Sequence, residues 1–194
     1  MVVQPSLFDA PPEPADGFAY EAGFIAADEE RALVAQLEAL AFKPFEFRGY
    51  LGNRRTVSFG WRYDFNERSL AEAAALPTWL GPLRRRAEGF AGLAEGAFVH
   101  ALLTEYAPGA GIGWHRDRPE FETVVGVSLL APCRFRLRRR AGKGFERREF
   151  TAEPRSAYRL AGDVREAWEH SIPPLDALRY SITFRSLRET ARGR

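Results

Sequence analysis

The sequence predicts an α+β protein with a jelly-roll-like core of short strands. Two segments with helical spacing of apolar residues come early in the chain, and the second half is almost wholly strand-like. Short strands separated by polar breaks are typical of a β-sandwich or barrel. We therefore expect a sheet-rich core with the early helices packed against it.

The two predicted helices cover Asp28–Ala41 and Pro77–Ala91. The first begins with three acidic residues, which suit the positive end of a helix dipole. The second begins with a proline, which the first helical turn tolerates. Between them, Phe42–Asn66 is rich in aromatics, glycine and arginine and is predicted to form strands and loops. The later predicted strands are Phe98–Tyr106, Val124–Leu130, Arg134–Arg140, Glu146–Thr151, Ala157–Leu160, Trp168–Ile172 and Arg179–Arg185.

Length and composition favour one globular domain without a membrane span. The chain has 194 residues, of which 45% are apolar and 13% aromatic. No apolar run is long enough to cross a bilayer, and the N-terminus lacks a secretory signal pattern. Cys133 is the single cysteine, so no intrachain disulfide can form. These features favour a cytosolic protein.

The net charge of +2 does not by itself indicate a nucleic-acid binder, but its distribution is uneven. Positive side chains concentrate around one predicted hairpin, at Arg134, Arg136, Arg138, Arg139, Arg140, Lys143, Arg147 and Arg148. Such a patch can bind phosphates. The alternative is the solvated face of an exposed sheet.

Residues 1–17 carry four prolines and little apolar periodicity, which predicts a flexible tail ahead of a domain at 18–194. Within it, Gln4-Pro5-Ser6-Leu7-Phe8 resembles the short peptide with which bacterial DNA-processing proteins bind the replicative sliding clamp. Gln4, Leu7 and Phe8 carry the resemblance. An anchor peptide that folds on binding suits a tail with two adjacent large apolar residues. The alternative is that Leu7 and Phe8 pack on the domain.

Two of the three histidines belong to a pattern that suggests a metal site. His115 and Asp117 are two residues apart, so their side chains point the same way in an extended chain. His170 lies on a later predicted strand that a folded sheet can bring beside them. Two histidines and one carboxylate leave three positions of an octahedron open, as a non-haem Fe(II) oxygenase requires.

A second pattern follows in Arg179-Tyr180-Ser181-Ile182-Thr183-Phe184-Arg185. The two arginines are six residues apart, so on a strand they share a face with Ser181 and Thr183. Arginines inside a barrel need anions, because an unpaired buried guanidinium is costly. A dicarboxylate co-substrate would supply them in forked geometry. The alternative places both arginines on the solvent face.

Together with Tyr106-Ala107-Pro108-Gly109, these motifs resemble the AlkB family of oxygenases over residues 18–188. The resemblance implies a double-stranded β-helix core, with Fe(II), 2-oxoglutarate and O2 as metal and co-substrates. It implies His115, Asp117 and His170 as iron ligands. It also implies that 2-oxoglutarate is bound by Arg179, Arg185, Tyr106, Thr104 and Ser181.

This chain departs from the family pattern at two positions. Thr104 stands where some members have an asparagine that contacts the co-substrate. Some members carry a base-contacting acid two residues beyond the aspartate ligand, where this chain has Pro119 followed by Glu120. Glu120 is therefore the candidate substitute.

The segment 53–66 falls where the family places its nucleotide-recognition lid. Aromatic faces there would stack on an extruded base, and arginines would hold flanking phosphates. The alternative is a hairpin whose aromatics belong to the core. The substrate candidates in this segment are Trp61, Tyr63, Arg54 and Arg55.

Other notable residues are assigned supporting roles. Gly109, Gly111 and Gly113 are expected to permit a close approach to the metal site. Cys133 is expected to be buried and inert, and His100 to be an ordinary strand residue. Trp114 and Trp168, which adjoin His115 and lie near His170, are expected to orient the ligands by packing.

The function implied by the resemblance is oxidative demethylation of alkylated nucleobases in single-stranded DNA or RNA. Three alternatives remain at this point: the same chemistry on a protein or small molecule, an enzyme of modified tRNA, or a binding module without catalysis.

Overall fold

The protein is described here by a computed structural model covering residues 15–47, 50–64, 69–72 and 74–188. The predicted clamp peptide, with Gln4, Leu7 and Phe8, lies outside these residues. Within them, no helix is long and apolar enough to cross a membrane.

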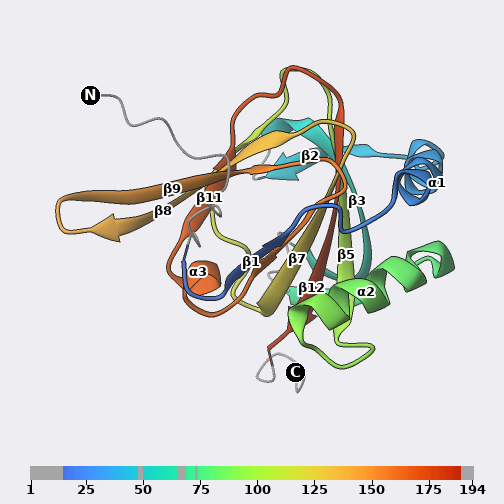
Figure 1. The fold of residues 1–194 in the computed structure, drawn as a ribbon, viewed down its shortest axis with the longest axis horizontal. Helices are drawn as coiled ribbons and strands as arrows, with labels where there is room; N and C mark the ends of the chain where they lie inside the picture. The colour runs from blue at the N-terminus through green and yellow to red at the C-terminus, as the bar shows by residue number, and fades with distance from the viewer. Residues whose placement is uncertain (1–14, 48–49, 65–68, 73, 189–194) are drawn as a thin grey trace.

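Two antiparallel sheets form the core, which confirms the predicted jelly roll (Figure 1). The major sheet has the order β1-β10-β7-β12-β5-β3-β2, with β4 paired to β3. Its strands are β1 (Phe18–Glu21), β10 (Ala157–Leu160), β7 (Phe121–Leu129), β12 (Arg179–Leu187), β5 (Phe98–Tyr106), β3 (Tyr50–Asp64), β2 (Lys43–Phe47) and β4 (Ser69–Glu72).

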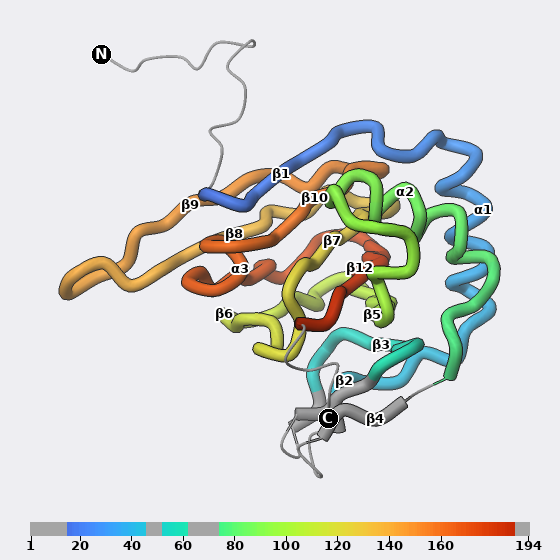
Figure 2. Tube along the Cα trace, turned by 90° about the horizontal axis from the view of Figure 1, so that it is seen from below, coloured from blue at the N-terminus to red at the C-terminus, as the bar shows by residue number. Residues whose placement is uncertain are grey.

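The minor sheet has the order β6-β11-β8-β9. Its strands are β6 (Ile112–His115), β11 (Glu169–Ile172), β8 (Cys133–Ala141) and β9 (Gly144–Ala152). The β8–β9 hairpin extends beyond the body of the molecule (Figures 1 and 2).

The predicted helices are present, with somewhat different ends. The first is α1 (Ala27–Glu38), which buries Leu33 and Leu37, and the second comprises a 3-10 turn, η1 (Thr78–Leu80), followed by α2 (Gly81–Ala91). Both helices cover one side of the major sheet, whereas the minor sheet lies on the other side (Figure 1). A third short helix, α3 (Gly162–Glu166), was not predicted.

The alternation of β12 explains how one strand serves both sides of the major sheet. Tyr180, Ile182 and Phe184 belong to the apolar cluster that includes residues of α1 and α2. The intervening positions, from Arg179 to Arg185, face the space between the two sheets. Every residue of β12 is buried, as expected of a central strand covered on both faces.

Candidate active site

The two histidines of the predicted metal site lie directly opposite each other. β6 pairs antiparallel with β11, and the register places His115 against His170. Their ring centroids are 4.2 Å apart. The His170 ring also stacks on buried Phe135 at 5.3 Å, which fixes it on the inner face of the minor sheet.

Asp117 completes this cluster from the loop after β6. Its Oδ2 lies 3.9 Å from His170 Nε2. Adjacent donors on an octahedral metal stand roughly 3 Å apart, because metal–nitrogen and metal–oxygen bonds are about 2.1 Å long. No three His, Cys, Asp or Glu side chains in the described part of the chain already stand at such spacing. The donor set nevertheless fits Fe(II) in kind, and the Asp117–His170 separation needs a contraction of roughly 1 Å.

The tautomer of His115 also suits metal binding. Its Nδ1 lies 2.9 Å from the carbonyl oxygen of Gly113, a geometry in which the Nδ1–H donates to the carbonyl. That leaves the Nε2 lone pair free for a metal ion, in the usual outer-shell arrangement of histidine ligands.

The site keeps both histidines neutral and the aspartate ionised. Burial lowers the pKa of His115, and burial together with the His115 charge lowers the pKa of His170 to about 3. Burial alone would raise the pKa of Asp117, but the charges of Arg185, His170 and His115 outweigh it and hold that pKa below its usual range. These are the protonation states that metal ligands need.

Two arginines hold the loop that carries Asp117. Arg165, buried in α3, donates to the carbonyls of Arg118 and Phe121, the latter at 2.8 Å. Arg188 donates to the Pro119 carbonyl at 2.8 Å. Because charge-assisted bonds to backbone carbonyls are strong, the loop is positioned before any ligand binds.

Arg179 is the clearest candidate for an anion-binding group. Its side chain is fully buried, and its Nε donates to Ser128 Oγ at 2.9 Å. Both terminal nitrogens, Nη1 and Nη2, are buried with no hydrogen-bond partner among the described residues. A buried guanidinium with two unmet nitrogens is costly, so this position suits the carboxylate of a bound ligand.

The other predicted co-substrate residues lie beside Arg179 on the same inner face. Tyr106 is opposite Arg179 in the register, and its ring centroid is 5.2 Å from the guanidinium carbon. Burial raises the pKa of Tyr106, so its hydroxyl stays protonated and able to donate. Thr104 and Ser181 face each other one step further along, both buried.

Arg185 differs from the prediction that it is a free receptor for a carboxylate. Its Nη2 and Nε already donate to Asp117 Oδ1, at 2.8 and 3.2 Å. The solvent-face alternative for both arginines is also wrong, because Arg185 is 8% exposed and Arg179 fully buried. The register places Arg185 at the metal end of β12, where the nearest carboxylate belongs to the protein.

His100 is a site residue that the sequence interpretation missed. It lies opposite Arg185 in the register, buried, with Nδ1 3.4 Å from Arg185 Nη1. Its ring stacks on Phe121 at 4.9 Å. Burial, and then the charge of Arg185, lower the pKa of His100 to about 3, so it is a neutral neighbour of the guanidinium. Sequence spacing could have indicated it, because His100 is an even number of residues from Thr104 and Tyr106 on one strand and so shares their face.

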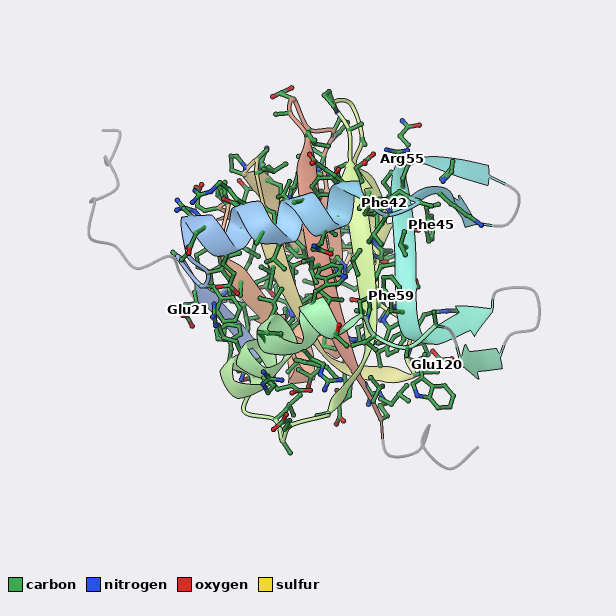
Figure 3. The ribbon with its side chains drawn as sticks, turned by 90° about the vertical axis from the view of Figure 1, so that its right-hand side faces the viewer. Glu21, Phe42, Phe45, Arg55, Phe59 and Glu120 are labelled. Atoms are coloured by element: carbon green, nitrogen blue, oxygen red, sulfur yellow. The ribbon has the colours of Figure 1, made fainter. Side chains whose placement is uncertain are left out.

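The two arginines of the predicted lid are consecutive residues of β3, so their side chains point to opposite faces of the sheet. Arg55 binds Glu105 in a forked pair, at 2.7 and 2.8 Å, so part of its hydrogen-bonding capacity is already used within the protein, and its assignment to substrate stays a prediction. Its neighbour Arg54 lies over the Phe45 ring at 3.8 Å, and its charge contributes to lowering the pKa of His115, after burial. Figure 3 shows Arg55 and Glu120 at opposite ends of the sheet edge.

The structure describes the other three substrate candidates in less detail. Trp61 is half-buried on β3, opposite Glu72 of β4. The backbone of Tyr63 continues β3, but its side chain lies outside the described residues. Glu120 is half-buried in the loop after Asp117, and its Oε2 is buried without a hydrogen-bond partner in the described structure.

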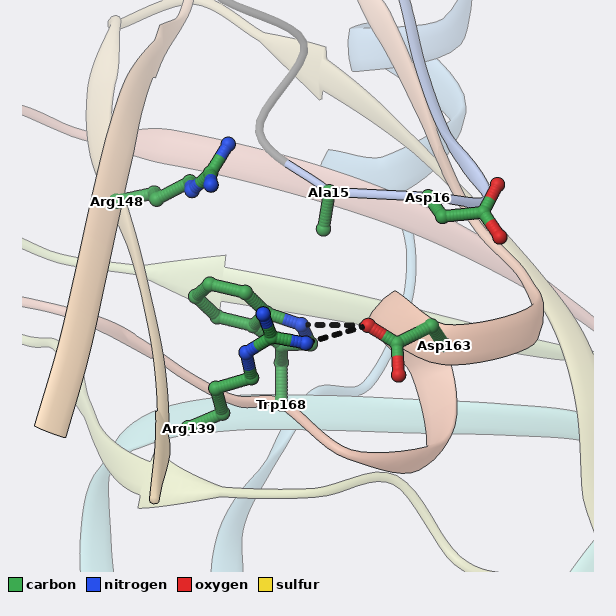
Figure 4. Close-up of a pocket in the computed structure, with 6 residues that line it drawn as sticks. All are labelled: Ala15, Asp16, Arg139, Arg148, Asp163 and Trp168. Atoms are coloured by element: carbon green, nitrogen blue, oxygen red, sulfur yellow. Dashed lines mark hydrogen bonds and ion pairs between the residues drawn. The ribbon is translucent and has the colours of Figure 1, made fainter. Parts of the chain in front are cut away.

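The two tryptophans do not orient the histidines, contrary to expectation. Trp114 faces outward from β6, under the guanidinium of Arg138 at 4.4 Å. Trp168 is buried and donates from Nε1 to Asp163 at 3.1 Å, while Arg139 covers its ring at 4.8 Å (Figure 4). The adjoining pocket, about 360 Å³, contains none of the predicted site residues, and one of its two arginines, Arg139, pairs with Asp163 at 3.1 Å.

The smaller expectations have mixed outcomes. Cys133 is buried and unpaired, as predicted. A Cβ on Gly111 would lie 2.6 Å from the carbonyl oxygen of Ile172, so this glycine permits the close approach of β6 to β11. A Cβ on Gly113 would meet nothing within 4 Å, so the expectation does not hold there.

A jelly roll that encloses two histidines, a carboxylate and a buried arginine with two unmet terminal nitrogens fits an enzyme that uses a metal ion and an oxoacid. A family model described as the 2OG-Fe(II) oxygenase superfamily matches residues 25–185. The chain therefore belongs to the 2OG-Fe(II) oxygenase superfamily, whose members use Fe(II), 2-oxoglutarate and O2. It is also similar to AlkB-type proteins.

Two curated relatives match at low identity. The alkylated DNA repair protein ALKBH8 homologue of Arabidopsis thaliana is 26% identical, over 87% of this chain and 54% of its own length. The uncharacterized protein L905 of Acanthamoeba polyphaga mimivirus is 30% identical, over 44% of this chain and 47% of its own. The chain thus spans about half the length of the curated relatives it matches.

Solved structures share the fold. OsALKBH1 aligns with a TM-score of 0.65 at 15% identity, covering 88% of this chain and 96% of that one. A 2OG-Fe(II) oxygenase family oxidoreductase from Burkholderia pseudomallei has a TM-score of 0.63 at 16% identity, with 90% and 87% covered. A Pseudomonas putida prolyl-4-hydroxylase has a TM-score of 0.59 at 16% identity, with 89% and 93% covered.

Proposed function

We propose that this oxygenase oxidatively removes alkyl groups from nucleobases of single-stranded DNA or RNA. The observation that carries the oxygenase part is the Arg179 guanidinium, whose two terminal nitrogens have no partner in the described structure. It lies between the two sheets, as does the cluster of His115, Asp117 and His170. The nucleobase part is supported by the relative named as an alkylated DNA repair protein. When bound, iron, 2-oxoglutarate and dioxygen supply the oxidation that hydroxylates an N-alkyl carbon, with succinate and carbon dioxide as by-products.

The protein's own residues position the reactants. Arg179 receives the distal carboxylate of 2-oxoglutarate in forked geometry, with the Tyr106 hydroxyl beside it. Arg185 holds the Asp117 carboxylate ionised and oriented through two hydrogen bonds to Oδ1. The hydroxylated alkyl group leaves as an aldehyde, and the base amine is restored.

Glu120 is proposed as the group that contacts the base. Its Oε2 is buried without a partner among the described residues, and the loop that carries it is fixed through Pro119 and Arg188. A carboxylate there can accept a hydrogen bond from an exocyclic amine of adenine or cytosine. We expect Glu120→Gln to change the relative rates on 1-methyladenine and 3-methylcytosine while retaining 2-oxoglutarate turnover.

The reaction is tested by mass spectrometry on short DNA and RNA oligonucleotides bearing 1-methyladenine or 3-methylcytosine. Purified protein is incubated with Fe(II), 2-oxoglutarate and air, with His115→Ala as the control, and succinate is measured in parallel. Loss of the methyl group in the wild type alone is the expected result. Succinate without demethylation would refute nucleobases as the substrate class and retain the oxygenase.

One alternative has its own support. The fold similarity to a prolyl-4-hydroxylase is nearly as extensive as the similarity to OsALKBH1, and a metal core does not determine its target. A protein substrate would therefore be the next class to test. The clamp-binding role of Gln4, Leu7 and Phe8 stays a prediction, tested by binding of the full chain to a bacterial sliding clamp with and without Leu7→Ala and Phe8→Ala.

A further inference from the structure

The outer face of the minor sheet carries a dense array of arginines that the proposed reaction does not use. The inner positions of β8, such as Phe135 and Leu137, are buried, so the alternate positions point outward. The same alternation applies to β9, which pairs with β8 along its whole length. We call this surface the arginine face; it consists of Arg134, Arg136, Arg138, Arg140, Arg147, Trp114 and Phe145.

The arginine face has an excess of positive charge. Its five arginines are accompanied by two outward carboxylates on the same strands: Glu149 binds Arg134 at 2.6 Å, and Glu169 binds Arg138 at 2.6 Å. No carboxylate of the described chain pairs with the other three, Arg136, Arg140 and Arg147. Arg136 donates from Nε to Ser171 Oγ at 3.1 Å. The charges of these three guanidinium groups are therefore not offset by an ion pair within the described residues.

Two aromatic rings are interleaved with these arginines. Trp114 has the guanidinium carbons of Arg136 and Arg138 over its ring, at 5.1 and 4.4 Å. Phe145 has those of Arg138, Arg140 and Arg147 at 4.5, 5.2 and 5.6 Å. Packing on a ring orients the planar cation and leaves its N–H groups free for ligand. Both rings are half-exposed, so part of each remains accessible.

The position of the arginine face connects it with the metal cluster. The sheet order β6-β11-β8-β9 runs from the projecting hairpin to the edge strand β6 (Figures 1 and 2). Trp114, on the outer side of β6, is the chain neighbour of His115, on the inner side. A chain bound along the face is therefore led to the sheet edge where the metal cluster lies.

We propose that the arginine face binds the sugar–phosphate backbone of single-stranded nucleic acid that flanks the target nucleotide. The inference rests on the proposed function for its account of the target nucleotide. Regular planar cations suit successive phosphates, and exposed rings between them suit bases, a combination typical of sequence-tolerant binding of single strands. An acidic protein could also pair with the cations, and a polyglutamate probe tests that alternative.

The test is equilibrium binding of an unmodified, fluorescently labelled oligodeoxythymidylate to the full chain across a range of salt concentrations. The variant Arg140→Gln with Arg147→Gln removes two charges from exposed side chains. Each lost contact to a single strand removes about 0.7 released counterion, which is roughly fourfold in affinity at 0.15 M salt. The double variant should therefore bind about fifteenfold more weakly, with a salt slope smaller by about 1.4.

The matched control is Arg31→Gln with Arg85→Gln, which removes two equally exposed charges from α1 and α2 on the other side of the molecule. This variant should bind as the wild type does. Equal weakening by both variants would reduce the effect to net charge and overturn the proposal, as would an unchanged salt slope in the hairpin variant. The proposal would also be overturned if the Arg140 and Arg147 substitutions weakened the binding of polyglutamate more than the binding of the oligonucleotide.

The outcome is separable from that of the proposed reaction, because the probe is unmodified and no turnover is measured. Face-dependent binding without demethylation of any oligonucleotide would contradict the reaction and retain the docking surface. Demethylation at rates that do not depend on strand length or on Arg140 and Arg147 would contradict the docking surface and retain the reaction. Equal unfolding temperatures of the three proteins ensure that binding differences are local.

Discussion

Arg179 gives the sharpest prediction, because the structure leaves two of its nitrogens unmet. We expect Arg179→Met to weaken the binding of 2-oxoglutarate. A charge-assisted hydrogen bond contributes about 1.5–3 kcal/mol, so losing the two that Nη1 and Nη2 can donate costs roughly 3–6 kcal/mol. That range corresponds to about a hundredfold to some ten-thousandfold in Kd. Isothermal titration with 2-oxoglutarate, in the presence of a redox-inactive divalent metal, measures it.

The same substitution should act in the opposite sense on the protein without ligand. The guanidinium is fully buried, and only its Nε has a partner, Ser128 Oγ. Replacing such a group by an apolar side chain of similar length removes an uncompensated charge, so the unfolding temperature of Arg179→Met should equal or exceed that of the wild type. Saturating 2-oxoglutarate, at about 100 times Kd, should stabilise the wild type by about 2.7 kcal/mol and leave the variant unchanged.

A ligand analogue separates the distal carboxylate from the rest of the molecule. 2-Oxopentanoate has the same chain length as 2-oxoglutarate and lacks the second carboxylate. The wild type should bind 2-oxoglutarate more tightly than 2-oxopentanoate, by the same factor by which Arg179→Met raises the Kd for 2-oxoglutarate. The variant should bind the two compounds almost equally. Retention of the preference in the variant would refute the assignment of Arg179 to that carboxylate.

Three further predictions concern the metal cluster and its supports. His170→Ala should abolish stoichiometric binding of Fe(II) under anaerobic conditions, measured by ultrafiltration and metal analysis, while far-UV circular dichroism stays unchanged. Gly111→Ala places a methyl group against the Ile172 backbone, so it should lower the unfolding free energy by about 1–3 kcal/mol in urea titrations; an unchanged midpoint would contradict the close approach. The pKa of His100 is about 3 in the fold and about 6.5 unfolded, so its neutral state contributes stability above pH 6.5 that is lost as the pH falls toward 3. His100→Asn, which retains an acceptor for Arg185, should therefore show a shallower loss of stability over that pH interval, by up to about 1.4 kcal/mol per pH unit; parallel curves would contradict this account.

Most of the strands, and the proximity of the three candidate metal ligands, were predictable from sequence. Short strand-like runs between polar breaks located β5 and β10 with their observed bounds. The shared parity of Arg179 and Arg185 predicted a common inner face, and both are buried. What the spacing could not supply is the register between strands distant in sequence, which places His170 opposite His115.

Other features could not be predicted from sequence, for two physical reasons. Some strands are too short to show a pattern, and an arginine can bind a carboxylate of the protein in place of a substrate phosphate. β6 has four residues, one of them glycine, too few to show a period. Arg55 resembled a phosphate-binding residue, but a carboxylate, Glu105, lies opposite it on β5. The one-residue offset between Arg54 and Arg55 decides which of them faces the metal cluster, and an unassigned strand register leaves that offset undetermined.

The charge of the interior connects the two halves of the site. Three arginines, Arg54, Arg179 and Arg185, lie close enough to Tyr106 to lower its pKa against the effect of burial. The carboxylate of the cluster, Asp117, is already bound to Arg185, and Arg165 also acts on it. Such an interior favours an added dianion and opposes an added dication. A dicarboxylate bound at Arg179 would offset the excess charge, so a divalent metal should bind the loaded protein more tightly than the empty one. Linkage then requires the metal to strengthen dicarboxylate binding by the same factor. The unmet nitrogens of Arg179 are thus part of the metal site as well, although they are too far along β12 to contact the ligands themselves.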